Sequence, residues 1–366
     1  MYWSSLIFIP LLFSHWIGQF LTFIYLIIIF LTYFLKRLKV SNFNFHYLFL
    51  FLILLLSIFF VVQADKILFS PTPLNIRYTI QYLSLFTLVG IFWFNLDFKN
   101  LKIDQIAKLI FWISFLSIFL EFILVNFFGL SKAVFPTAKM ESITYFSDVY
   151  GFHRPWGLTG SPSANGGILL LSYLFLYELK IKSFKYNFLT FIAIIMTISG
   201  QAILTSAVIG GYLFIKNLPV TRVSRITIYI IFASFFYLIL QADLLQKISL
   251  NYIYTTLIRF SNLDATLFSL NSLEWLSGTL GDIVLRDYNT SEVYPFTFIF
   301  LWGAPLFIFF WGAIYFFVSK TKMPLLWFMA IFVSSLHYPT ILFIEAQLII
   351  VLLFLNSFKE NLFKSR

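Results

Sequence analysis

The chain has 366 residues, of which 60% are hydrophobic and 11% are charged, and its mean hydropathy is +0.91. A soluble domain carries about 25% charged residues, so this composition excludes an ordinary soluble protein. The net charge of +10 does not indicate a nucleic-acid partner, because the basic residues are scattered between hydrophobic runs and form no stripe.

Apolar runs of the length that a membrane helix needs recur along the whole chain. These unbroken runs differ from the alternating pattern of a membrane β-barrel. The sequence therefore predicts an all-α fold: a polytopic helical integral membrane protein in which residues 1–366 form a single transmembrane domain of about 11 to 12 transmembrane helices.

The predicted spans begin with residues 1–35, which are interrupted at Ser14 and Gly18 and fit one long span or two short ones. The runs on either side of Ser199 are short for full spans, and small residues at Ser206, Gly210 and Gly211 predict a close helix contact in the second of them. The other predicted spans are 46–62, 77–95, 107–129, 164–179, 187–200, 202–216, 226–241, 295–318, 323–338 and 340–356.

Alternate loops between these spans contain most of the lysine and arginine residues, for example Lys36, Lys180 and Lys320. The positive-inside rule assigns those loops to the cytoplasm. The opposite side then has two long extracytoplasmic loops, 130–163 and 242–294, whose aromatic residues argue against disorder. Long loops of this kind are usually functional, so we expect the working surface on the extracytoplasmic side.

One polar segment, 150–167, contrasts with the apolar chain around it; its sequence is YGFHRPWGLTGSPSANGG. The planar guanidinium of Arg154 suits phosphate oxygens, although a structural arginine that bonds loop carbonyls is the alternative. Gly157 permits unusual backbone angles and close approach of a ligand. Ser161 and Pro162 are typical of a helix start, where backbone amides favour an anion.

Two more arginines, Arg259 and Arg286, lie in the second long loop. Together with Arg154 they would form a clamp, that is, a set of cations that binds a diphosphate. The alternative is that they form exposed ion pairs within the loop, which contribute little to stability. A general base must be a histidine or a carboxylate, and the candidates are His153 and Glu292.

Ionisable residues within apolar spans are costly and are candidates for function, or for a structural helix-end contact; Glu121 and Glu345 are of this kind. The chain has no cysteine, and its four histidines are not at ligand spacing, so we expect no metal site and no cofactor.

In a chain of many spans, Arg154-Pro155-Trp156-Gly157 followed by Gly160-Ser161-Pro162-Ser163 at a helix start resembles the bacterial O-antigen and capsular polysaccharide polymerases and the related O-antigen ligases. Segments 198–204 and 289–303 are also similar to parts of these proteins, the second to a stretch in which a polar residue precedes a helix with an internal glycine. Two departures are visible. Gly200 or Gln201 stands where many members have the arginine of a Ser-Arg pair, so Arg259 or Arg286 would take its place. Glu292 is the nearest polar residue where the ligases have a histidine, which favours a polymerase.

The resemblance implies metal-independent glycosyl transfer at the periplasmic face of the bacterial inner (cytoplasmic) membrane. The growing glycan leaves undecaprenyl diphosphate and joins a hydroxyl of a lipid-linked repeat unit. Partners would be the undecaprenyl-diphosphate-linked oligosaccharide, membrane lipids, a chain-length regulator and a flippase. The alternatives are a lipid-linked oligosaccharide flippase or transporter and an O-antigen ligase, and the product, O-antigen of lipopolysaccharide or capsule, stays open. The implied site consists of Glu292 and His153 as catalytic candidates and Arg154, Arg286, Arg259, Gly157, Ser161 and Asn165 as substrate-binding candidates.

Overall fold

The computed structural model describes residues 9–13, 19–37, 81, 83–85, 87–89, 102–130, 153–181, 183–197, 199–217, 270–278, 294–336 and 340–364. These residues form helices and turns without any strand, which confirms the all-α prediction for the part of the chain that is described. The elements in chain order are α2 (Ile9–Leu12), α4 (Gln19–Arg37), α7 (Ile103–Asn126), α9 (Pro162–Glu178), α10 (Phe184–Thr197), α11 (Gly200–Asn217), α15 (Ser272–Ser277), α17 (Tyr294–Val318), α18 (Pro324–Ser334), the 3-10 helix η3 (Thr340–Leu342) and α19 (Ile344–Lys364).

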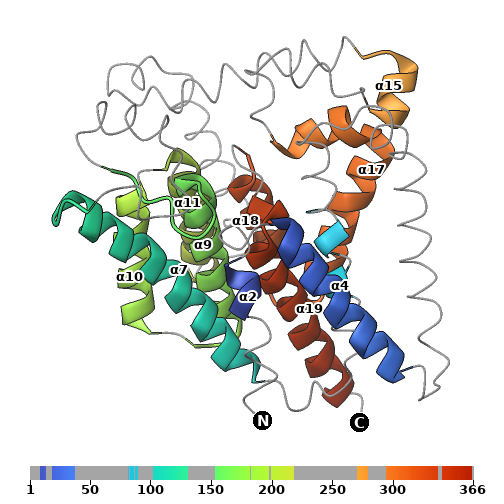
Figure 1. The fold of residues 1–366 in the computed structure, drawn as a ribbon. Helices are drawn as coiled ribbons and strands as arrows, with labels where there is room; N and C mark the ends of the chain where they lie inside the picture. Colours follow the sequence, from blue (N-terminus) through green and yellow to red (C-terminus); the bar gives the residue numbers. More distant parts are fainter. Residues whose placement is uncertain are drawn as a thin grey trace.

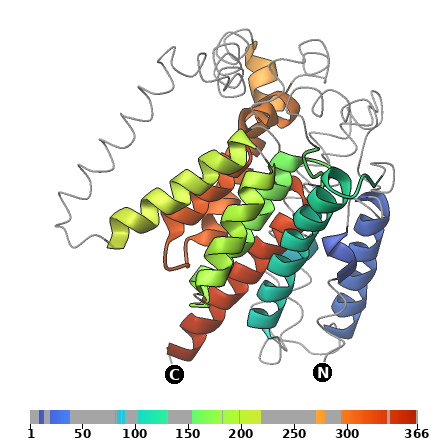
Figure 2. The same cartoon turned by 90° about the vertical axis from the view of Figure 1, so that its left-hand side faces the viewer.

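Helices α9 and α19 form the centre of the packing. Figure 1 shows α19 in the middle, with α7, α9, α10 and α11 on one side and α4 and α17 on the other. Helix α9 packs against α7, α10, α11, α18 and α19. Nearly all its residues are buried, so it has no polar face directed to the outside. A helix that is hydrophobic all round belongs in the interior of a bundle or a membrane, and α9 takes the interior position. Figure 2 shows the same bundle from the side, with the axes of α7, α4 and α19 roughly aligned.

Helix α9 begins where its capping residues predict. The hydroxyl of Ser161 accepts a hydrogen bond from the backbone N–H of Ala164 at 3.5 Å, and Pro162 occupies the first helical position. Proline is well suited to this position because its missing N–H has no partner within the helix.

Most other predicted spans differ from the structure by a few residues. The last predicted span, 340–356, is not one continuous helix, because η3 covers its first residues. Helix α19 then continues beyond the predicted end. Of the first predicted span, 1–35, the described residues 9–13 and 19–35 belong to α2, the turn residue after it, and α4. The predicted spans 46–62 and 226–241 lie outside the described residues, and 77–95 is described only at positions 81, 83–85 and 87–89, all of them helical.

The expected close contact at Gly210 of α11 is not present, because a Cβ atom built there meets nothing within 4 Å. The close contacts are made by α9 instead. A Cβ at Gly166 would lie 2.5 Å from the Cβ of Ala202 in α11, and a Cβ at Gly167 would lie 2.8 Å from Oγ1 of Thr340. The helix at the centre of the bundle, with neighbours on every side, is the one that requires small residues.

Helix α7 is long and apolar enough to cross a membrane, and among the described residues it is the one helix that meets the criteria of length and apolar composition together. Several helices nevertheless direct large apolar side chains outward. Phe184, Phe188 and Phe191 of α10 are 81%, 50% and 65% exposed, and α4, α7, α17 and α18 have similar outward faces. Exposed apolar area of this extent indicates a surface that lipid or a partner covers.

A buried carboxylate fixes the C-terminal end of α9 to the start of α18. Oε1 of Glu178 accepts the backbone N–H of Lys322 at 2.7 Å, and Oε2 accepts the indole N–H of Trp327 at 3.4 Å. The Nζ of Lys322 donates to the carbonyl oxygen of Glu178 at 3.2 Å. Glu178 is only 3% exposed, so these donors replace water around the carboxylate.

We expect Glu178→Gln to lower the stability of the fold. The amide has one acceptor oxygen where the carboxylate has two, so one buried donor on α18 loses its partner, at a cost of about 1–3 kcal/mol. The measurement is the apparent Tm in detergent, with Asp104→Asn on the exposed first turn of α7 as control. A Glu178→Gln protein whose Tm equals that of the wild type would contradict the role of Glu178 in holding the end of α9 to the start of α18.

Candidate functional site

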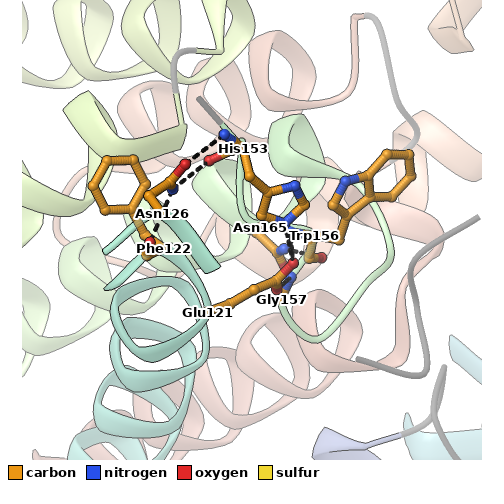
Figure 3. Close-up of polar contacts among 7 residues, drawn as sticks. All are labelled: Glu121, Phe122, Asn126, His153, Trp156, Gly157 and Asn165. Atoms are coloured by element: carbon orange, nitrogen blue, oxygen red, sulfur yellow. Dashed lines mark hydrogen bonds and ion pairs between the residues drawn. The ribbon is translucent and has the colours of Figure 1, made fainter. Parts of the chain in front are cut away.

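The segment 153–161 connects to the start of α9 and lies against the C-terminal half of α7. Residues His153, Arg154 and Ser161 in it are buried, at 3%, 3% and 4% exposure. Figure 3 shows that side chains from α7 on one side and Asn165 of α9 on the other contact this loop. A polar loop that is buried must satisfy its backbone groups with protein partners, and the following contacts do so.

Glu121 of α7 provides the most concentrated of these contacts. Its Oε1 lies 2.8 Å from Nε2 of His153 and accepts the backbone N–H of Trp156 at 2.9 Å. Its Oε2 accepts the backbone N–H of Gly157 at 2.7 Å. Glu121 is 1% exposed. Two backbone N–H groups and one imidazole nitrogen thus converge on one buried carboxyl group, which has two acceptor oxygens.

Asn126, at the end of α7, pairs with the backbone of His153. Its Oδ1 accepts the N–H of His153 at 2.6 Å, and its Nδ2 donates to the carbonyl oxygen of His153 at 2.9 Å (Figure 3). The same Nδ2 also donates to the carbonyl oxygen of Phe122 at 2.9 Å. Since both backbone groups of His153 are bonded to one side chain, the start of the loop has a fixed position on α7.

Asn165, in the first turns of α9, holds the other side of the loop. Its Oδ1 accepts the backbone N–H of Thr159 at 3.2 Å and the hydroxyl of Thr159 at 3.1 Å, and its Nδ2 donates to the carbonyl oxygen of Trp156. Gly157 has φ +50 and lies directly against this side chain. The predicted need for glycine at 157 therefore has a physical reason, which is a left-handed backbone under a neighbouring amide.

Arg154 reaches from the loop to the end of α10. Its Nε donates to the carbonyl oxygen of Thr197 at 2.9 Å. Two residues after Thr197, the hydroxyl of Ser199 accepts the N–H of Ala202 at 3.3 Å and so caps the start of α11. The hydroxyl of Ser199 also donates to that of Ser163 at 2.9 Å, which joins the N-terminal ends of α9 and α11.

Several positive groups lie near Arg154, on the loop that the buried carboxylate of Glu121 also contacts. Two helix N-termini meet at the Ser163–Ser199 hydrogen bond, and each contributes partial positive charge from its backbone amides. The guanidinium of Arg154 adds a full positive charge that is largely removed from water. An anion that approaches such a group interacts more strongly than it would at an exposed arginine. The site is therefore suited to a phosphate or another oxyanion.

The structure brings together five of the eight residues that the sequence nominates. His153, Arg154, Gly157, Ser161 and Asn165 form one unit of loop and helix start. Within this unit, Nε2 of His153 contacts Glu121, the hydroxyl of Ser161 caps α9, and the side chain of Asn165 bonds the loop. These polar atoms therefore stabilise the loop and the helix start. The remaining three residues, Arg259, Arg286 and Glu292, lie outside the described residues. Glu345 is fully buried in the first turn of α19.

Glu121 is a candidate in the sequence as a carboxylate within an apolar span, but the sequence does not predict its partners. Asn126 and Thr197 are not among the sequence-predicted site residues. Asn126 at the end of an apolar span is an ordinary helix terminus in the sequence, and Thr197 acts through its backbone, which any residue possesses. No local signal distinguishes either residue.

Gly157→Ala should disrupt the loop. A Cβ at this position would lie 2.7 Å from Cγ of Asn165, whose side chain is already committed to three hydrogen bonds. Overlap and lost hydrogen bonds together should cost about 2–4 kcal/mol. Gly129→Ala is the matched control, because Gly129 has φ +63 and nothing within 4 Å of its Cβ position. The measurement is amide hydrogen exchange over residues 153–161, and equal exchange in the two variants would show that the contact with Asn165 has no effect.

No family model, no curated protein and no solved structure matches this chain. Among the described residues, no group of three or more His, Asp or Glu side chains is arranged to hold a metal ion. The function is therefore argued from the chemistry of the residues around Arg154.

Proposed function

We propose that this protein is a multi-pass protein of the bacterial inner membrane that polymerises a surface polysaccharide, O-antigen or capsule, at the periplasmic face. In this reaction the bond between the sugar's anomeric carbon and the carrier diphosphate breaks. A new bond forms from the same carbon to a hydroxyl of the next lipid-linked repeat unit. The hydroxyl proton goes to a base, and the undecaprenyl diphosphate leaves with the negative charge. The reaction so written requires no metal and no cofactor.

The distribution of side chains supports the membrane part of the proposal. Ionisable residues such as Glu121, Arg154 and Glu178 are buried, whereas phenylalanines of α10 are exposed. This arrangement reverses the pattern of a soluble protein and suits a lipid environment, in which charged groups face the interior of the bundle. The apolar stretches of several other helices, such as Phe184–Thr197 and Pro324–Ser334, are short for a full span, but local thinning of the bilayer accommodates a short hydrophobic stretch.

The single observation that carries the chemical part is the burial of Arg154 beside the joined N-termini of α9 and α11. A diphosphate leaving group gains negative charge as the glycosidic bond breaks. A guanidinium and helix amides that are already in place stabilise that charge without reorganisation. Arg259 and Arg286 are the proposed further cations of the clamp.

Glu292 is the proposed base, with His153 as the second candidate. The contact between Nε2 of His153 and Glu121 at 2.8 Å, deep in the protein, favours a structural role for this histidine. Gly157, Ser161 and Asn165 are proposed to act on the substrate through the loop that they shape.

The test is reconstitution of the purified protein in liposomes with undecaprenyl-diphosphate-linked repeat units as the sole glycan. A polymerase converts these units into a ladder of longer lipid-linked chains. Movement of single units across the bilayer without elongation would identify a flippase instead. Transfer that occurs only after lipid A-core acceptor is added would identify a ligase.

A further inference from the structure

We infer that Glu121 is a positioning residue: its buried carboxylate fixes the loop so that the guanidinium of Arg154 lies buried beside Thr197 and the start of α11. Only the identity of the group that Arg154 binds, a diphosphate, rests on the proposed function. The placement of Arg154 itself is a property of this fold and is measured separately below.

The contacts of Glu121 lie on both sides of Arg154 in the sequence. His153 precedes the arginine, and its Nε2 contacts the carboxyl group; Trp156 and Gly157 follow the arginine and donate their backbone N–H groups to the same side chain. The segment between these contacts consists of Arg154 and Pro155 alone. Proline fixes its own φ near −65° and restricts the residue before it, so the backbone at Arg154 has little remaining freedom. A carboxylate that holds both ends of so short a segment determines the direction in which the arginine side chain leaves the loop.

The side chain of Arg154 then connects this loop to a different helix. Its Nε donates to Thr197 at the end of α10, 43 residues away in the sequence. Arg154 therefore bridges α7, through the loop, and α10. The hydrogen bond from Arg154 to Thr197 can form only while the loop stays packed against α7. Asn126 also holds His153, but it acts on one side of Arg154 only, whereas Glu121 acts on both.

Glu121→Gln tests the inference with a change of charge and almost none of shape. The glutamine amide has one acceptor oxygen, and its NH₂ group would face an N–H donor of the loop. At least one of the Trp156 and Gly157 amides then lacks an acceptor in a buried position, so the loop should leave α7 more often and expose Arg154.

The readout is the rate at which phenylglyoxal modifies Arg154, followed by mass spectrometry of its peptide. In the wild type Arg154 is 3% exposed and should react slowly. In Glu121→Gln we expect at least about a tenfold faster reaction, from the loss of one hydrogen bond to a charged group. Glu178→Gln is the matched control, because Glu178 is buried as Glu121 is, at 3% and 1% exposure, and also accepts a backbone N–H, at the other end of α9. Arg154 should react at the wild-type rate in that variant.

Equal rates at Arg154 in the wild type and in Glu121→Gln would overturn the inference, and so would an equal acceleration in Glu178→Gln. If Glu121→Gln is not recovered as a folded protein, Glu121→Asp takes its place: it keeps the carboxylate but shortens its reach, and an unchanged rate there overturns the inference as well. Polymer synthesis is assayed in parallel. Faster modification of Arg154 with full polymer synthesis would leave the positioning role standing and reject the proposed function.

Discussion

An Arg154→Ala protein should insert into the membrane at the wild-type level and yet lose polymer synthesis. The reason is electrostatic: a buried guanidinium provides both charge and directed N–H groups, and alanine provides neither. The charge pair in question is the proposed one between Arg154 and the departing diphosphate. Removal of one partner from a buried, hydrogen-bonded charge pair costs about 2–5 kcal/mol, which corresponds to a fall in the rate of polymer synthesis of at least about thirtyfold. The measurement is the length distribution of the surface glycan in a deletion strain that expresses the variant.

Arg154→Lys separates charge from geometry. Lysine keeps the positive charge but has no planar fork, and it cannot reproduce the Nε donation to Thr197. We expect shortened glycan, intermediate between the wild type and Arg154→Ala. Full-length glycan from a stably inserted Arg154→Ala protein would contradict the role of this arginine.

The sequence predicts the elements of this fold better than their contacts. Ser161 and Pro162 predict the start of α9 because capping chemistry is local, and the helix begins at Pro162. The contacts of the loop are not local. Glu121 meets His153 across 32 positions, and Arg154 meets Thr197 across 43. A pattern of residue types contains no record of which distant backbone group will lie beside a side chain, so these pairs became visible only in the packed structure.

The same limit applies to α17. An apolar run at 295–318 predicts one continuous span, and the structure has one helix interrupted at Gly303, where φ is +80 and ψ is 164. Gly303 and Pro305 are both present in the sequence, and the resemblance pointed to an internal glycine there. The sequence does not show which element packs against this part of α17. Helix α15 packs against α17, and Figure 1 shows α17 changing direction near α15.

Gly303→Ala should lower the stability of the fold more than Gly157→Ala does, because its new Cβ meets backbone atoms. The new Cβ would lie 2.6 Å from the carbonyl carbon of Leu276, still closer to its oxygen, and 3.0 Å from the backbone nitrogen of Gly278. These are backbone atoms at the end of α15, so no side chain can rotate away. Overlap costs about 1–3 kcal/mol and a left-handed φ at a non-glycine residue a similar amount, so we expect a loss of about 2–6 kcal/mol.

The consequence for function follows from where α15 lies in the sequence. Residues 272–277 belong to the predicted second long loop, 242–294, which also contains the proposed Arg259, Arg286 and Glu292. If α15 is displaced from α17, this loop loses an attachment to the bundle, whereas Glu121 and the loop around Arg154 keep theirs. Gly303→Ala should therefore lower the apparent Tm, increase amide exchange in α15 and reduce polymer synthesis, while Arg154 stays as protected from phenylglyoxal as in the wild type. Gly312→Ala in the same helix is the control, because nothing lies within 4 Å of its Cβ position. A Gly303→Ala protein as stable as Gly312→Ala would mean that α15 does not pack on α17 as the structure shows.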